Sequence, residues 1–147
     1  MKREEVTEKI LDEMREKNIT FEQIAKTVGR HKVWVAAAIF GQASMTAEEA
    51  GKIISLLGLD PAYGKILQEC PYKGSLDTIV PTDPLIYRFY EIMAIYGVPM
   101  KAIIHEMFGD GIMSAIDFEI DIRKKEDPKG DRVIVVFNGK FLPYKKW

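Results

Sequence analysis

The 147-residue sequence contains one cysteine, Cys70, and two histidines, His31 and His105. A single cysteine cannot form an internal disulfide, which is compatible with a reducing compartment. Neither histidine has a second histidine, a cysteine or a pair of carboxylates at the spacing of metal ligands. The sequence therefore argues against a metal site and against a catalytic triad built on histidine.

Long apolar runs and an excess of one charge are also missing. No run approaches the roughly 18 apolar residues of a membrane span, and the charged start MKREEVTEKI is unlike a signal peptide. The net charge of −1 provides no general attraction to nucleic acid or to an anionic membrane. We therefore expect a cytoplasmic protein without a membrane partner.

Residues 1–75 carry helical signals and are expected to form an N-terminal all-helical domain. Two capping boxes, at residues 20–23 and 46–49, predict helix starts, and Asp60 followed by Pro61 predicts another. Gly29 and Gly58 predict helix ends. The pattern FEQIAKTVG followed by HKVWVAAAI resembles the helix-turn-helix of phage-repressor-like domains. A DNA-binding regulator is therefore an alternative function.

The chemistry of this pattern argues against that alternative. A recognition helix presents polar and basic side chains to the bases, whereas here only Arg30, His31 and Lys32 precede a stretch of valine, tryptophan, alanine, isoleucine and phenylalanine. Residues 1–60 contain 9 basic and 10 acidic residues. We favour a helical module used for packing and expect no nucleic acid as a partner.

Residues 76–147 are expected to form a second domain with helices and a β-hairpin, which makes the fold class α+β. The segment Gly97-Val98-Pro99 predicts a break between a helix at 84–96 and another near 99–108. Apolar residues then alternate with charged ones from Ile116 to Arg123, and the turn KKEDPKGD leads into the strand RVIVVFN.

Two strands and two helices make a small core with open sheet edges. Isolated two-stranded hairpins are marginal in water, and apolar edges invite pairing. The sequence therefore predicts that this half is completed by another copy of the chain. A monomer whose hairpin packs on its own helices is the alternative.

The segment LIYRFYEIMAIYG, residues 85–97, contains only two charged residues, Arg88 and Glu91. Apolar side chains cover both remaining sides of the predicted helix, so it should be buried nearly all round. Two interpretations of the charges are open: a structural salt bridge between residues three apart, or a solvent-reachable pocket where subunits meet.

Three longer stretches closely resemble the cyanase family, also called cyanate hydratase or cyanate lyase. They are PTDPLIYRFYEIMAIYG, KAIIHEMFGDGIMSAIDFEIDI and NGKFLPYKKW. The resemblance implies a lyase that decomposes cyanate, with bicarbonate as co-substrate, to carbamate and carbon dioxide; the carbamate then gives ammonia. Such a reaction serves cyanate detoxification or nitrogen metabolism. The resemblance also implies a homodecamer of five dimers, intertwined C-terminal domains, and no metal or organic cofactor.

The family's catalytic residues fall on Arg88, Glu91 and Ser114 of this sequence. Arginine offers a permanent charge and a planar fork of donors, which suits small anions such as cyanate and bicarbonate. Leu142 matches a family position whose backbone lies near the anion site, although as a residue it is typical of a core. His105 also matches a family position, and we interpret it as a packing or hydrogen-bonding residue.

Overall fold

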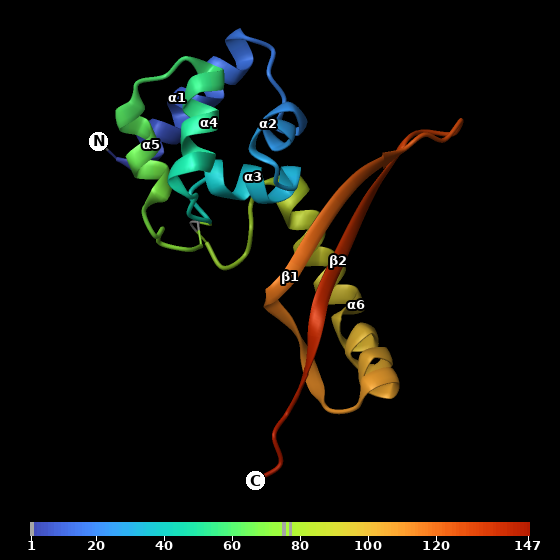
Figure 1. Cartoon of the computed structure of the whole chain (residues 1–147). Helices are drawn as coiled ribbons and strands as arrows, with labels where there is room; N and C mark the ends of the chain where they lie inside the picture. Colours follow the sequence, from blue (N-terminus) through green and yellow to red (C-terminus); the bar gives the residue numbers. More distant parts are fainter. Residues whose placement is uncertain (1, 75, 77) are drawn as a thin grey trace. The chain divides into compact units, whose positions relative to one another are not determined.

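The computed structural model describes residues 2–74, 76 and 78–147, and the chain divides into two compact units, Met1–Ser75 and Leu76–Trp147. Over the described residues the first unit contains helices only, and the second contains one long helix and a two-stranded sheet (Figure 1). This mixture of helices and a small sheet confirms the expected α+β class.

The helices of the first unit begin and end where local capping predicts. They are α1 (Arg3–Glu16), α2 (Phe21–Val28), α3 (Lys32–Ile39), α4 (Ala47–Leu57) and α5 (Pro61–Gln68). The Thr20 and Thr46 side chains accept hydrogen bonds from the N–H groups three residues later, so both capping boxes form. Gly29 and Gly58 adopt left-handed conformations that end α2 and α4.

The apolar stripes of these helices meet in one core. Its fully buried members come from every helix of the unit: Val6, Ile10, Ile24, Val35, Ala38, Ile39, Ala50, Ile53, Leu57 and Leu67. Burial of a large aliphatic side chain contributes about 1.5–3 kcal/mol. The first unit therefore has a hydrophobic core of its own.

The second unit consists of α6 (Pro84–Phe108), β1 (Gly111–Lys125) and β2 (Arg132–Pro143). The two strands pair antiparallel and extend well beyond the segments 116–123 and 132–138 that alternation and composition predict (Figure 1). In the turn between them, the Lys129 N–H donates to the Asp127 carboxylate at 2.8 Å, and Gly130 has a φ of 124°.

The predicted break at Gly97-Val98-Pro99 is wrong, because α6 is continuous through Pro99. Proline removes one backbone donor and crowds the carbonyl four residues earlier, here that of Ile95, which can bend a helix without ending it. A helix end also needs a cap, and Gly97 is absent from the residues with a positive φ. The capped ends lie instead at Asp83 and Gly109.

The prediction that this helix is buried nearly all round is also wrong for a single chain. None of the 25 residues of α6 is buried. Within the described part of the second unit, only Pro81, Gly111 and Ser114 are buried, and Ile116 of β1 is 98% exposed. Amphipathic patterns show which side chains avoid water, but not which chain covers them. Here one chain does not cover them.

In the first unit, Arg3 joins helix ends that are distant in sequence. Its guanidinium donates to the Ile66 carbonyl, to the Ala38 carbonyl at 2.7 Å and to the Ala43 carbonyl at 3.3 Å. These acceptors lie in α5, in α3 and in the segment before α4, where carbonyls near helix ends lack partners within the helix. The Ile66 carbonyl also accepts the Glu69 N–H at 3.3 Å and the Ala38 carbonyl the Gly41 N–H at 3.1 Å, so Arg3 supplies each of them with a second, charged donor.

Replacing Arg3 with methionine keeps a linear side chain but removes every donor. We expect Arg3→Met to lower the free energy of unfolding by about 2–3 kcal/mol, because charge-assisted hydrogen bonds are lost and their acceptors stay partly buried. Thermal unfolding of the whole protein measures this change. The matched control is Arg15→Met, since the Arg15 side chain is 75% exposed and pairs with Asp12 one turn away on the same helix. Equal melting temperatures for both variants would contradict this role of Arg3.

Candidate active site

The first turns of α6 position the two charged residues of the helix. The Asp83 carboxylate accepts hydrogen bonds from the N–H groups of Leu85 at 2.9 Å and Ile86 at 3.0 Å, which fixes the start of the helix. Residues three apart then lie on the same side. Arg88 Nη1 and Glu91 Oε2 are 3.3 Å apart, so the expected ion pair forms.

Arg88 is further oriented by its own helix. Its Nε donates to the Pro84 carbonyl at 3.2 Å, and its guanidinium carbon lies 5.2 Å from the centre of the Tyr87 ring. The Arg88 side chain is nevertheless 61% exposed and that of Glu91 41% exposed. An ion pair this exposed contributes little to stability. Arginine carries more N–H donors than these contacts use, so the guanidinium can still bind a ligand.

Ser114 lies in a different setting, as a buried polar residue near the start of β1. Its Oγ accepts hydrogen bonds from the N–H groups of Ile116 at 3.1 Å and Asp117 at 3.0 Å. A hydroxyl has two lone pairs and one proton. Because both lone pairs are engaged, the remaining capacity of Ser114 is to donate its proton, and within the described part of the chain no acceptor receives it.

Several contacts tie the start of β1 to the end of α6 and to the end of β2. His105 Nε2 lies 3.2 Å from the Gly111 carbonyl, which agrees with a hydrogen-bonding histidine. The Tyr144 N–H donates to the Asp110 carbonyl at 3.1 Å. The rings of Phe108 and Phe141 stack with their centres 5.0 Å apart. These contacts hold the loop that leads to Ser114.

Leu142 pairs with Ile112 across the sheet. Its residue is 39% exposed, so the interpretation of its side chain as core is wrong within one chain. The Leu142 carbonyl comes close to Gly111: a Cβ at position 111 would lie 2.4 Å from that oxygen. The course of the Leu142 backbone therefore depends on the missing side chain of Gly111, which pairs with the next residue, Pro143.

Sequence reasoning missed Gly111 and Gly139 as residues that shape this region. A Cβ at Gly139 would lie 2.6 Å from the Ser114 carbonyl oxygen, closer than real Cβ atoms approach. The available signal was a glycine inside a strand, which often marks a bulge or a close approach of backbone. The register between β1 and β2 decides which residue of β1 the glycine lies against.

A single chain assembles only part of the predicted site. Arg88 and Glu91 contact each other, whereas Ser114 hydrogen-bonds within its own strand. Among the residues that the structure describes, no hydrogen bond or ion pair joins Ser114 or Leu142 to the Arg88–Glu91 pair. Within one chain these contacts therefore do not link the predicted residues into one cluster.

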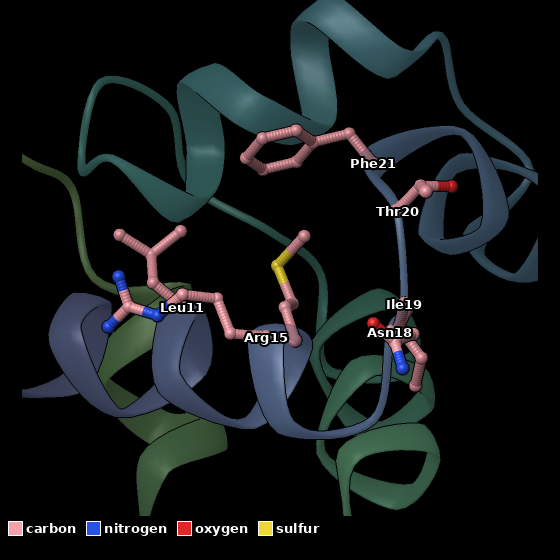
Figure 2. A pocket seen from close by; sticks show the side chains of 7 residues that line it. Leu11, Arg15, Asn18, Ile19, Thr20 and Phe21 are labelled. Carbon is pink, nitrogen blue, oxygen red and sulfur yellow. The ribbon is translucent and has the colours of Figure 1, made fainter.

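Other parts of the molecule offer weaker candidates. A pocket of 540 Å³ lies beside α1 and the start of α2 (Figure 2). Its lining is mainly apolar, and its charged member, Arg15, pairs with Asp12. Within residues 2–74, 76 and 78–147, no group of three or more His, Cys, Asp or Glu side chains could hold a metal ion. None of the helices in this range is long and apolar enough to cross a membrane.

Two basic residues near the start of α3, Arg30 and Lys32, already have acidic partners. Arg30 Nε lies 2.6 Å from Glu49 Oε1, and the Arg30 guanidinium lies over the Trp34 ring at 5.3 Å. The Thr46 N–H and then the Arg30 guanidinium lower the pKa of the Glu49 carboxyl, so this pair stays ionised. Lys32 lies 3.6 Å from Glu22. Phosphate binding would have to compete with these pairs.

Comparison with known families covers both units. A model described as "Cyanate hydratase, N-terminal" matches residues 3–71, and one described as "Cyanate lyase C-terminal domain" matches residues 78–146. The chain thus matches, in one polypeptide, two models that belong to a single class of lyase.

Individual relatives and a solved structure agree with the two family models. The chain is 58% identical over 143 residues to a cyanate hydratase of Acaryochloris marina, with 97% of each chain covered. It is 57% identical over 142 residues to a cyanate hydratase of Synechocystis, covering 97% of this chain and 95% of the relative. The crystal structure of cyanase from T. urticae matches with a TM-score of 0.85 at 40% identity, covering 94% of this chain and 96% of that one. The chain belongs to the cyanate hydratase family.

The arrangement around Arg88 predicts binding of a small dianion. We expect millimolar oxalate to raise the melting temperature of the wild-type protein, because a ligand that binds only the folded state stabilises it. Arg88→Lys keeps the charge but loses the planar fork of donors, so most of this shift should disappear.

The matched control for this measurement is Arg123→Lys. Arg123 also pairs with a carboxylate, that of Asp121, and its side chain is 60% exposed, much like that of Arg88. Oxalate should stabilise this variant as it does the wild type. Equal stabilisation of the Arg88→Lys variant would exclude Arg88 as the anion-binding group.

Proposed function

We propose that this protein is a cyanate hydratase, a lyase that decomposes cyanate with bicarbonate as co-substrate. The observation that carries the proposal is the similarity to curated cyanate hydratases over 97% of the chain. The residue types at the candidate site support the same reaction. A DNA-binding regulator has no comparable support, since Arg30 and Lys32 near the start of α3 are paired with carboxylates.

Both proposed substrates are small anions, so the site must bring like charges together. At about 4 Å, two unit charges repel by about 1 kcal/mol in water and by several times more in a partly desolvated site. The Arg88 guanidinium would offset this repulsion and orient carboxylate-like oxygens with its fork of donors. The Ser114 hydroxyl would donate one further hydrogen bond, because its lone pairs are engaged.

The proposed reaction forms and breaks bonds between the substrates alone. A bicarbonate oxygen attacks the electrophilic carbon of cyanate, and the cyanate nitrogen takes up a proton. The mixed intermediate then loses carbon dioxide and leaves carbamate, so cyanate, bicarbonate and one proton give carbamate and carbon dioxide. Carbamate with a second proton gives ammonia and a second carbon dioxide. Proximity and charge stabilisation would account for most of the catalysis.

The remaining groups have supporting roles in this scheme. Glu91 would hold Arg88 in its orientation through the ion pair at 3.3 Å. The backbone of Leu142 would lie at the edge of the anion site. The proposed steps require no metal or organic cofactor. The same reaction would serve either cyanate detoxification or nitrogen supply.

We further propose that the active form is a homodecamer of five dimers with intertwined C-terminal units. The support is the lack of buried side chains in α6 together with the exposed apolar residues of the hairpin. Partner chains would cover these faces and bring Ser114 to Arg88. The repressor-like helical unit would then serve packing rather than nucleic-acid binding.

The reaction can be tested directly by ammonia release from cyanate. We expect release only when bicarbonate is present, without added metal and in the presence of a chelator. Arg88→Lys should lose most of the activity, because geometry as well as charge is required. Turnover without bicarbonate, or none under any condition, would contradict the proposed function.

The assembly can be tested by light scattering on the purified protein. We expect a particle near ten times the chain mass of 16.8 kDa, with the dimer as the smallest stable form on dilution. The exposed apolar faces make a free single chain unfavourable. A folded and active monomer at micromolar concentration would contradict this assembly.

A further inference from the structure

The pairing of β1 with β2 is interrupted beside Ser114. Met113 pairs with Phe141 and Phe118 pairs with Gly139, so residues 114–117 of β1 lie opposite Lys140 alone. We call residues 114–117 the bulge. A bulge of this kind leaves the extra residues unpaired across the sheet and re-aims their side chains.

The bulge is held by the side chain of its first residue. The Ser114 Oγ accepts hydrogen bonds from the N–H groups of Ile116 and Asp117. These two residues have no partner on β2 in this register. The position of the hydroxyl and the course of the backbone are therefore coupled. A shift of the bulge would move the Ser114 proton donor with it.

The bulge approaches β2 at Gly139. A Cβ there would lie 2.5 Å from Met113 Cγ and 2.6 Å from the Ser114 carbonyl oxygen. Met113 Cγ is next to the Cβ of its side chain and could move away only with a change of χ1, and the carbonyl belongs to the backbone of the bulge. Gly139 does not have a positive φ, so alanine could adopt its backbone conformation. The effect of alanine at this position would therefore be steric.

We propose that Gly139 is a positioning residue for Ser114. Because Gly139 has no side chain, the Ser114 backbone can pack directly against β2. This contact fixes the position of the Ser114 hydroxyl, which donates a hydrogen bond to the reacting anions. The inference rests on the proposed function, in which Ser114 stabilises the charge of the transition state. A donor misplaced by about 1 Å can lower a rate by on the order of 100-fold.

A double-mutant cycle tests whether Gly139 acts through Ser114. Gly139→Ala alone should lower kcat by about 10–100-fold. Ser114→Ala alone should lower kcat by about 100–1,000-fold, as loss of one oxyanion donor does. When the hydroxyl is already absent, adding Gly139→Ala should lower kcat by less than about 3-fold, because coupled residues are not additive.

The matched control is Gly51→Ala, at an exposed helical glycine of α4 with open space around its Cβ position. This variant should keep wild-type activity. Wild-type kcat in Gly139→Ala, or equal effects of Gly139→Ala with and without Ser114, would overturn the proposal.

Hydrogen exchange supplies a readout that does not depend on activity. In the wild type the N–H groups of Ile116 and Asp117 should be protected by Ser114 Oγ, and Gly139→Ala should accelerate their exchange, measured by mass spectrometry on peptides covering 114–118. Unchanged protection would overturn the proposal. If the wild type is inactive towards cyanate, the proposed function fails, and this measurement still decides whether Gly139 positions Ser114.

A second variant distinguishes a folding defect from a loss of Ser114 positioning. Met113→Ala combined with Gly139→Ala removes the side-chain contact and keeps the backbone contact with the Ser114 carbonyl. This double variant should fold and show the same loss of kcat and of amide protection as Gly139→Ala. Failure to fold even with Met113→Ala would assign Gly139 a purely structural role and contradict the proposal.

Discussion

The second unit cannot bury its own apolar side chains. This constraint underlies both the proposed assembly and the setting of the Arg88–Glu91 pair. Long aliphatic and aromatic residues face water along α6, and Ile116 of β1 is 98% exposed. About ten such side chains are each roughly half exposed, so covering them would contribute about 8–15 kcal/mol, which is comparable to the roughly 4–15 kcal/mol that association costs. Association with further chains is the physical solution open to such a surface. The first unit, by contrast, closes its own core.

The same constraint explains why a largely apolar helix carries Arg88 and Glu91. In one chain both are substantially exposed, and their ion pair has little energetic value. In the proposed assembly, neighbouring chains would cover the helix and partly desolvate the pair, and an arginine without partners would then cost several kcal/mol. Glu91 together with a bound anion can satisfy it. If the proposed assembly brings the Arg88 guanidinium close to the Ser114 hydroxyl, the two donors together would be suited to holding two small anions against their repulsion.

Sequence predicted most of what is local and little of what depends on distant partners. The caps at Thr20, Thr46 and Asp60 and the pairing of Arg88 with Glu91 follow from residues three or fewer apart. The break at Pro99 was wrong, because a proline weakens a helix whereas a cap ends it, and no cap forms at Gly97. The burial of α6 was wrong for one chain, because periodicity does not show which chain supplies the cover. The contact between Gly139 and Ser114 depends on strand register, which composition does not reveal.

In the proposed oligomer, one chain supplies Arg88 and another supplies Ser114 to the same site. Mixing subunits tests it most directly. Arg88→Lys and Ser114→Ala homo-oligomers, each strongly impaired, would be dissociated, combined in equal amounts and reassembled. A site built from two chains can then contain both wild-type residues, so ammonia release from cyanate should recover to a substantial fraction of the wild-type rate. If hybrids confirmed by native mass spectrometry stay as inactive as their parents, the two residues act within one chain and the claim is contradicted.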